Sequence, residues 1–455
     1  FPFLRLPLEL REQVYSHYFH PGDHLVRNTA LESKGFFGGV YHWDLDVFYV
    51  NKQIHRESKR VWRRENIFVK IATPWPSAVN HISSEGLVPI VCADAQANAF
   101  TGHHAVVQID SPMQIVTPEH MVVMLADDLP LFTRTWYYSA LSYPTLNERL
   151  NTTFMLRNPA KADEASEEDR EEQGQEQEQD ELGVPLAVQR KLLLPFEHVK
   201  GLHGSLFIGF SNTVQSELAR LQARPIPSLE QSLESATDYL AAGDAALAKS
   251  TEPTALEAIE LYKKAFHAIH ILIHGRTRRV MADVFFQEAV SHGRYAGQTG
   301  ITVRVVLRLK LVSRFLAAYN QLSRWDDSAF WGMRSVTILE ESLNPDFEMF
   351  LAEVLGGSDV GMIYLRTGIA FWNMENKRED WMGELISYAD DELAGSRRLW
   401  DAAVRFLRHA NKEEARSELL AYGVPRETVA LFADVQAPRM DVESMVARDG
   451  SSTSE

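Results

Sequence analysis

Three histidines in the second half of the chain have a spacing that could bind a metal. His267, His270 and His274 lie at positions i, i+3 and i+7 of one expected helix, so their imidazoles would share a face. No HExxH pattern accompanies them, and Cys92 is the only cysteine, which excludes a thiolate zinc cluster within one chain. A second set repeats this spacing, but Pro21-Gly22 interrupts the helix that would align its members, His17, His20 and His24. The sequence therefore predicts no metal site.

The patterns that would support catalysis are incomplete. Gly209-Phe210-Ser211 begins like a GxSxG nucleophile elbow, but Thr213 stands where the second glycine is needed. The phosphate-binding patterns GxxxxGKS, GxxxxGKT and GxGxxG do not occur in the chain. We therefore expect a protein without catalytic residues and without a cofactor.

Much of the net charge of −16 is concentrated in one segment. Residues 163–181 hold eleven acidic side chains and one basic one, Arg170, a balance of −10 that leaves −6 for the rest of the chain. The surrounding segment 159–183 has almost no apolar side chain, so it cannot bury enough surface to offset chain entropy. We expect a disordered acidic insert, either a tolerated surface loop or a decoy for a basic partner. The polar tail 442–455 is expected to be disordered too.

One expected helix is strongly basic, with Lys52, Arg56, Lys59, Arg60, Arg63 and Arg64. It could contact nucleic acid or the acidic insert, or it could be a solvated helix face. No aromatic platform or nucleic-acid-binding motif accompanies it, so we expect no nucleic-acid partner. No apolar run approaches the roughly 20 residues that cross a bilayer, so no membrane partner is expected. The single cysteine favours a reducing compartment, the cytoplasm or the nucleus.

The arrangement of expected elements indicates an α+β fold. Runs of β-forming residues between turn residues predict a small mixed α/β middle region, 71–210, that carries the insert; its strands are expected at 67–72, 105–110, 121–126, 152–156 and 199–210. From residue 228 to 435 apolar residues recur at spacings of three and four, which predicts helices at 229–248, 254–274, 303–322, 328–342, 361–374, 396–410 and 412–421.

Small and aromatic residues recur in these helices at positions that suggest a repeat. Ala258, Tyr262 and Ala265 occupy small, aromatic and small positions of one helix, and Gly243 occupies a small position of the helix before it. The run 318–328 ends one helix and opens another, with Trp325, Gly332 and Ser335, and a weaker unit joins 369–372 to Ala402, Ala403 and Phe406. This region resembles a tetratricopeptide-like α-helical repeat, which implies a groove for a peptide or protein. Simple antiparallel helix packing is the other interpretation.

The first 70 residues contain two linked motifs. Residues 3–15 read Phe-Leu-Arg-Leu-Pro-Leu-Glu-Leu-Arg-Glu-Gln-Val-Tyr, and residues 48–58 contain Val-Asn-Lys-Gln-Ile-His-Arg-Glu, followed by Asn66-Ile67-Phe68. Together they resemble the F-box-like amino-terminal region of many fungal proteins, although 25 residues, 20–44, separate the two halves. The resemblance implies docking on the Skp-type linker of a cullin ubiquitin ligase, through Leu6, Pro7, Leu8, Leu10 and Val14. Alternatively, these helices only cap the sheet that follows.

These observations predict a non-catalytic protein-interaction adaptor. The F-box-like resemblance implies a substrate receptor of a Skp-cullin-F-box ubiquitin ligase, with protein partners at both ends of the chain. The alternative function is a helical-repeat scaffold with no ubiquitin-ligase role.

Overall fold

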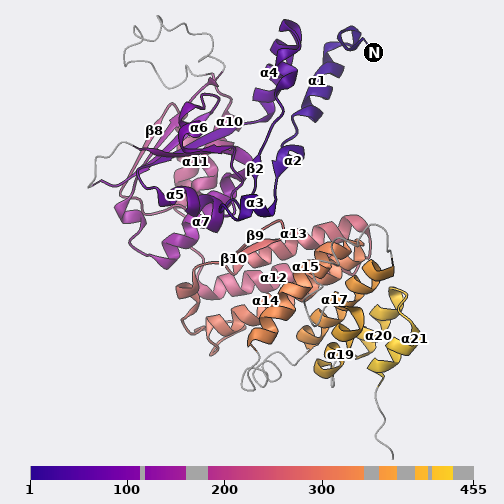
Figure 1. The fold of residues 1–455 in the computed structure, drawn as a ribbon. Helices are drawn as coiled ribbons and strands as arrows, with labels where there is room; N and C mark the ends of the chain where they lie inside the picture. Colours follow the sequence, from indigo (N-terminus) through magenta and orange to yellow (C-terminus); the bar gives the residue numbers. More distant parts are fainter. Residues whose placement is uncertain are drawn as a thin grey trace, which may run out of the picture. The chain divides into compact units, whose positions relative to one another are not determined.

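The structure is a computed structural model that describes residues 2–112, 118–159, 183–342, 358–376, 395–407 and 412–433. A sheet lies in the first half of the chain and long helices dominate the second half, so the predicted α+β class is confirmed (Figure 1). Two compact units are present, one made of residues 1–238 and 263–304 and the other of residues 239–262 and 305–455. The predicted insert 159–183, apart from its two end residues, and the predicted tail 442–455 fall outside the described residues.

The first unit contains a six-stranded mixed sheet with the strand order β4-β6-β3-β5-β7-β8. Strands β3 and β5 are parallel, as are β7 and β8, and the other neighbours are antiparallel. The strands are β3 (Phe68–Thr73), β4 (Cys92–Ala93), β5 (Ala105–Asp110), β6 (His120–Leu125), β7 (Asn151–Leu156) and β8 (Gly204–Ile208). Four of the five predicted strands therefore lie within one residue of their expected places. The run 199–210 is a strand only over β8, because Gly201 and Gly209, both with positive φ, bracket it.

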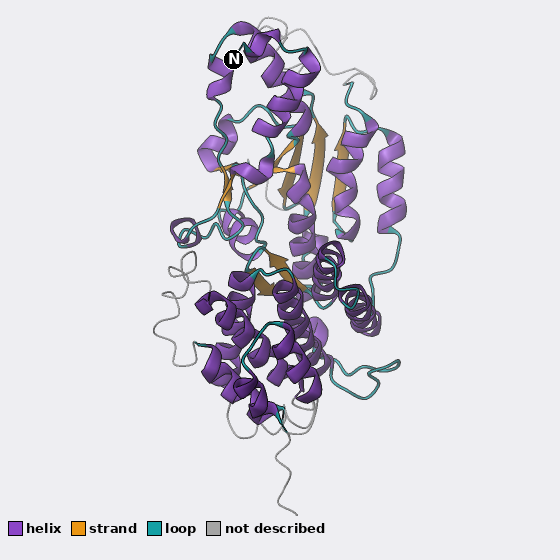
Figure 2. Ribbon diagram, turned by 90° about the vertical axis from the view of Figure 1, so that its right-hand side faces the viewer, coloured by secondary structure: helices purple, strands orange, loops and turns teal. Residues whose placement is uncertain are grey.

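The two faces of the sheet bury alternate side chains, as the pleat of a strand requires. Val69 and Ile71 of β3 join the larger core, together with Phe132 of α7. Phe68 and Val123 lie in a second cluster on the other face. Helices accordingly flank the strands on both sides (Figure 2). The larger core is covered by α7 (Leu129–Ser142), α10 (Leu186–Leu193), η6 (Leu194–His198) and α11 (Asn212–Gln222), and the smaller one by α6 (Asp94–Ala99).

Shorter elements complete the first unit. A β-hairpin, β9 (Ile271–His274) and β10 (Thr277–Val280), follows helix α13 (Glu252–Ala268). The other short elements are α5 (Ser77–Asn80), η3 (His81–Glu85), η4 (Ala126–Asp128), η5 (Asn147–Arg149) and η7 (Asp283–Phe286).

The hairpin corrects the predicted helix 254–274, since helix α13 ends at Ala268. His270 adopts a left-handed backbone (φ 54°) that stops the helix, and the β-forming run Ile271-Leu272-Ile273 then pairs across a turn at Gly275 (φ 55°). His267, His270 and His274 therefore lie on a helix, a turn and a strand. They share no helix face, so the expected alignment of their imidazoles was wrong.

The other predicted helices are found at the expected places, to within a few residues, although 408–410 lie outside the described residues. The helices of the carboxy-terminal region are α12 (Leu229–Leu247), α13 (Glu252–Ala268), α14 (Gly300–Gln321), α15 (Trp325–Ser342), α17 (Ser358–Asn376), α19 (Ser396–Phe406), α20 (Lys412–Ala421) and α21 (Arg426–Val429), and they end in η8 (Ala430–Phe432). Helices α12, α13 and α14 contribute residues to both units.

Glycines allow helices of the second unit to approach one another closely. A Cβ atom at Gly243 of α12 would lie 2.7 Å from Cδ1 of Tyr262 in α13. A Cβ atom at Gly332 of α15 would lie 2.6 Å from Cγ2 of Thr367 in α17. Gly243 and Gly332 are two of the small positions picked out in the sequence, and each packs against the neighbouring helix.

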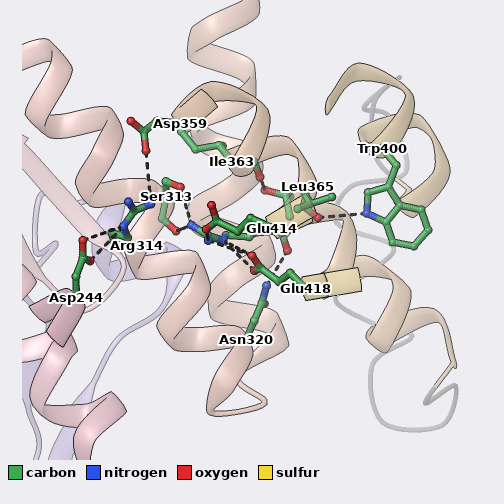
Figure 3. A network of polar contacts seen from close by, with 12 residues as sticks. Asp244, Ser313, Arg314, Asn320, Asp359, Ile363, Leu365, Trp400, Glu414 and Glu418 are labelled. Carbon is green, nitrogen blue, oxygen red and sulfur yellow. Dashed lines mark hydrogen bonds and ion pairs between the residues drawn. The ribbon is translucent and has the colours of Figure 1, made fainter. Parts of the chain in front are cut away.

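Arg366 of α17 is buried and hydrogen-bonds to residues of two other helices. Its partners Ser313, Asn320 and Glu418 are labelled in Figure 3. Its guanidinium donates to both carboxylate oxygens of Glu418 in α20 (Nε to oxygen 2.9 and 3.2 Å), and to the hydroxyl and carbonyl of Ser313 in α14 (2.8 and 3.0 Å). Asn320 of α14 in turn donates to the carbonyl of Arg366 (2.9 Å). One side chain thus connects three helices, and burial without these partners would be costly.

Gly368→Ala tests the close contact between α17 and α19. A Cβ atom there would lie 2.6 Å from Cδ1 of Trp400, whose Nε1 donates to the carbonyl of Leu365 (3.2 Å). Helix propensity alone predicts stabilisation by about 1 kcal/mol, whereas overpacking costs about 1–3 kcal/mol. We expect net destabilisation in urea unfolding, reduced in a Trp400→Phe background. If Gly368→Ala alone raised the free energy of unfolding, the close contact with Trp400 would be contradicted.

Candidate protein-docking surface on the amino-terminal helices

The amino-terminal segment forms a pair of helices, α1 (Leu8–Tyr18) and α4 (Lys52–Glu65), that lie side by side (Figure 1). Helix α1 follows Pro7, whose missing N–H is not needed at a helix start. Helix α4 follows Asn51, whose side chain accepts a hydrogen bond from the N–H of Ile54 (2.9 Å). Asn51 is therefore the N-cap of α4.

An apolar seam joins the inner sides of the two helices. Tyr15 of α1 and Phe19, which follows the helix, are buried against Ile54 and Val61 of α4. Phe3, from the turn η1 (Phe3–Arg5), packs edge-on against Tyr15 with 5.6 Å between ring centroids. Only one side of α1 is used in this seam.

A buried ion pair fixes the two helices to each other. Arg11 of α1 donates to Glu57 of α4 through Nε (2.8 Å) and Nη2 (2.6 Å), and their side chains are only 9% and 13% exposed. The Tyr15 hydroxyl also donates to Glu57 (3.2 Å). These hydrogen bonds, above all those from Arg11, lower the pKa of Glu57 to about 2. The carboxylate is therefore ionised at neutral pH and bidentately bound.

Arg11 also holds the segment that precedes α1. Its Nη1 donates to the carbonyl of Leu6 and, at 3.4 Å, to the carbonyl of Leu4. The guanidinium thus donates hydrogen bonds both to the Glu57 carboxylate and to backbone carbonyls of the turn before Pro7. The position of the Leu-Pro segment on the helix pair follows from this one side chain.

A second, more exposed set of ion pairs lies along the same helices. Glu12 of α1 pairs with Arg64 (3.1 Å) and Arg60 of α4, and both lower the pKa of the Glu12 carboxyl. The Ser16 hydroxyl donates to Glu65 (2.6 Å). Two of the six basic residues of α4 therefore face α1, which gives part of the basic helix a structural role.

The other side of α1 carries apolar side chains that remain exposed. Leu10 is 44% and Val14 47% exposed, and they lie one helical turn apart on the same face. Of the predicted docking residues, Leu6 is half-buried, whereas Pro7, Leu8, Leu10 and Val14 are exposed. The exposed Tyr18 continues this strip by one more turn, and Leu4 and Leu8 are exposed at the amino-terminal end of the helix. We call these five exposed side chains together the α1 outer face: Leu4, Leu8, Leu10, Val14 and Tyr18.

Residues 20–44, which separate the two motifs, tie the helix pair to the sheet. They contain α2 (Pro21–His24), β1 (Leu25–Val26), α3 (Thr29–Glu32) and β2 (Val40–Tyr41), and η2 (Asp46–Tyr49) follows before α4. Val40 forms a parallel bridge with Ile90, and the Tyr41 hydroxyl donates to Asp128 (3.0 Å). Trp62 of α4 packs 5.0 Å from Phe68 of β3, between ring centroids. The pair does contact the sheet, as the capping interpretation expects, but through its inner residues and not through the α1 outer face.

Asp128, the partner of Tyr41, makes the stability of this anchor pH-dependent. Burial raises its pKa to about 7, against about 3.9 in an unfolded chain. Between these values the folded chain binds a proton that the unfolded chain lacks, so the free energy of unfolding falls as pH rises. In Asp128→Asn the side chain stays neutral at every pH. The stability of this variant relative to the unmodified chain, measured by urea unfolding, should therefore rise by about 2–3 kcal/mol from pH 5 to pH 8. A pH-independent difference would contradict the raised pKa.

Several other residues picked out in the sequence have structural partners. Arg134 contacts His267 (3.0 Å), and His270 packs among aromatic rings, 4.6 Å from that of Tyr138. Burial lowers the pKa of both histidines to about 3. Ser211 caps α11, because its hydroxyl accepts from the N–H of Thr213 (3.2 Å). Within the described residues no group of three or more His, Cys, Asp or Glu side chains could hold a metal ion.

One polar arrangement was missed in the sequence. Glu85, His81 and Ser139 form a hydrogen-bonded chain at the edge of a cavity in the first unit. His81 and Glu85 are four residues apart, a spacing visible in the sequence. Ser139 comes from α7, and only the fold brings it to them.

Comparison with known proteins finds no matching family model, no matching curated protein and no matching solved structure. In the parts of the chain that the structure describes, no helix combines the length and the apolar character needed to span a membrane.

Arg11→Met tests the role of the ion pair, because it removes the charge and keeps much of the side-chain length. Glu57 would lose its main counter-charge in a largely buried position, so we expect the Tm to fall by about 5 °C or more at pH 7. The loss should shrink near pH 3, where Glu57 of the variant is protonated. The control is Arg60→Met, which removes an exposed partner of Glu12 and should change the Tm by about 2 °C or less. Equal effects of the two variants would contradict the assigned role.

Proposed function

We propose that this chain is a non-catalytic adaptor that docks on the Skp-type linker of a cullin ubiquitin ligase through its amino-terminal helices. The α1 outer face makes the contact, with Pro7, Leu8, Leu10 and Val14 supplying apolar surface and Leu6 supporting the turn. The carboxy-terminal helices bind the target protein. This role places the protein in the cytoplasm or the nucleus.

The observation that carries the proposal is the way in which the two motif halves meet. Arg11 belongs to the Leu-Pro-x-Glu-Leu-Arg half and Glu57 to the Val-Asn-x-Gln-Ile-x-x-Glu half, and they form the buried ion pair. The residues that define the F-box-like resemblance are therefore those that fix α1 on α4. The same ion pair leaves apolar residues of α1 outside.

The exposure of this surface supports a docking role. Exposed apolar side chains lower the solubility of a protein unless a partner covers them, and clustered exposed apolar residues commonly mark protein interfaces. Leu10 and Val14 do not contribute to the core between α1 and α4. A partner explains their exposed position on one side of α1 better than a contribution to stability does.

The carboxy-terminal helices support target binding of the tetratricopeptide type. Gly243 and Tyr262 pack against each other across α12 and α13, as paired helices in such repeats do. Ala258 and Ala265 flank Tyr262 on α13 and are fully buried. Helix pairs that stack in this way form a continuous surface along which an extended peptide can bind.

A direct binding experiment tests the proposal. The double variant Leu10→Ala/Val14→Ala should weaken binding of the full chain to purified Skp-type linker by about tenfold or more, because two apolar contacts are lost. Biolayer interferometry measures the Kd. Folding should be unaffected, since both side chains are solvent-exposed.

The matched control is Leu206→Ala/Ile208→Ala, which shortens two comparably exposed apolar side chains on β8. It should leave the Kd unchanged. The proposal fails if the unmodified chain does not bind the linker, or if both double variants bind equally well.

A helical-repeat scaffold without a ubiquitin-ligase role is the second candidate. The Arg366 network favours it, because a buried guanidinium that joins α14, α17 and α20 makes a rigid platform regardless of the amino-terminal helices. In that case proximity labelling in cells would recover partners of the carboxy-terminal helices and no linker.

A further inference from the structure

A cavity in the first unit has the size of a small-molecule site. Its volume is about 740 Å³, within the roughly 300–1,000 Å³ that such sites occupy. Strand β3, the turn η3, helix α7, the segment 143–150 and residues 280–284 line it. The cavity is formed wholly within one compact unit and does not involve the amino-terminal helices.

The walls of the cavity are mainly apolar and rich in aromatic rings. Trp75, Phe132, Trp136 and Tyr143 supply rings, and aliphatic side chains fill the spaces between them. Phe132 and Trp136 lie 5.8 Å apart between ring centroids and are part of the larger core, so this wall is rigid. Such walls favour a flat apolar body in the ligand.

One part of the lining is polar and oriented. Glu85 lies 2.8 Å from Nδ1 of His81, and the Ser139 hydroxyl lies 3.3 Å from Nε2 of the same ring. When the imidazole is neutral, the carboxylate accepts the Nδ1–H, which leaves Nε2 as an acceptor for a hydroxyl. These three side chains can therefore orient one hydrogen-bonding group of a ligand.

The hydrogen-bonded side chains of Glu85, His81 and Ser139 are suited to ligand binding and not to nucleophilic catalysis. Ser139 lies within α7, where main-chain N–H groups donate to carbonyls of the helix. Those groups cannot stabilise an oxyanion beside the serine. Glu85 also disfavours a negatively charged ligand, because a second carboxylate beside it would be repelled.

The backbone around the cavity is held in uncommon conformations on two sides. His81 and Glu85 lie on a π-helical turn, η3, a rare element that often occurs at functional sites. Leu87, just after this turn, and Ala282, which lines the cavity, both have φ of 54° and are buried in one cluster. Left-handed backbone at buried residues other than glycine is maintained only where surrounding packing imposes it, and it recurs at ligand sites.

We propose that this cavity binds a small uncharged molecule with a flat aromatic or fused-ring body and a single hydroxyl, which hydrogen-bonds to His81 and Ser139. The rings lie against Trp75 and Trp136. The ligand hydroxyl donates to His81 Nε2 and accepts a hydrogen bond from Ser139, whose O–H turns from Nε2 to the ligand oxygen. A phenol fits this description, whereas the corresponding carboxylate does not. Ligand binding here is separate from docking through the α1 outer face.

Ligand-observed NMR with 2-naphthol as the probe tests the proposal on the full chain, with 2-naphthoate as the charged comparison. We expect saturable binding of 2-naphthol, with a Kd at least about tenfold lower than that of 2-naphthoate. His81→Ala should raise the Kd for 2-naphthol by about three- to tenfold, because one hydrogen bond is lost. The absence of saturable 2-naphthol binding, or equal affinity for the two probes, would overturn the proposal.

Two blocking variants locate the site. Ala78→Phe fills the cavity from α5 and should abolish binding, whereas Ala219→Phe, at an exposed position of α11, should leave it unchanged. If Ala78→Phe fails to fold, Val284→Trp blocks the exposed rim, where the larger ring needs no room in the core. Binding that survives a folded blocking variant would place the probe elsewhere and overturn the assignment.

Discussion

The pairing of Arg11 with Glu57 is the constraint on which the amino-terminal helices depend. A guanidinium and a carboxylate are costly to remove from water, and the cost is offset only when nearly all their hydrogen-bonding atoms find partners. Here Arg11 reaches Glu57 and the carbonyls of Leu4 and Leu6 together, while Tyr15 adds a donor to Glu57. The ion pair therefore fixes the position of the Leu-Pro segment as well as the packing of two helices.

The same physical device recurs in the second unit, with a different result. Arg366 is buried and satisfied by Glu418 and Ser313, so it sets the relative positions of three helices (Figure 3). An apolar side chain could fill that space with comparable or greater stability, but without the directional contacts that select one packing. In both units a buried arginine therefore contributes to a defined geometry, and the surfaces proposed for binding lie on the elements that it positions.

The sequence predicts the regular parts of this fold well, because they depend on local periodicity. The run 105–110 is rich in β-forming residues and is a strand over its whole length. The prediction at 254–274 failed because polar and apolar spacing alone does not reveal that His270 adopts a left-handed backbone. The run Ile271-Leu272-Ile273 before Gly275 was the available signal for a hairpin. The cavity was beyond prediction, since Ser139 meets His81 only through the packing of α7 on the sheet. The docking residues follow from the F-box-like resemblance, and their exposure adds support.

Hydrogen–deuterium exchange on the full chain, with and without saturating Skp-type linker, tests the central claim most directly. The measurement compares the amides of residues 4–18, the segment that carries the α1 outer face, with those of the rest of the protein, and it needs no substitution. We predict that the linker slows exchange of amides in residues 4–18, while exchange in β8 and in the carboxy-terminal helices stays unchanged. Unchanged exchange in residues 4–18, or protection confined to the carboxy-terminal helices, would contradict the account.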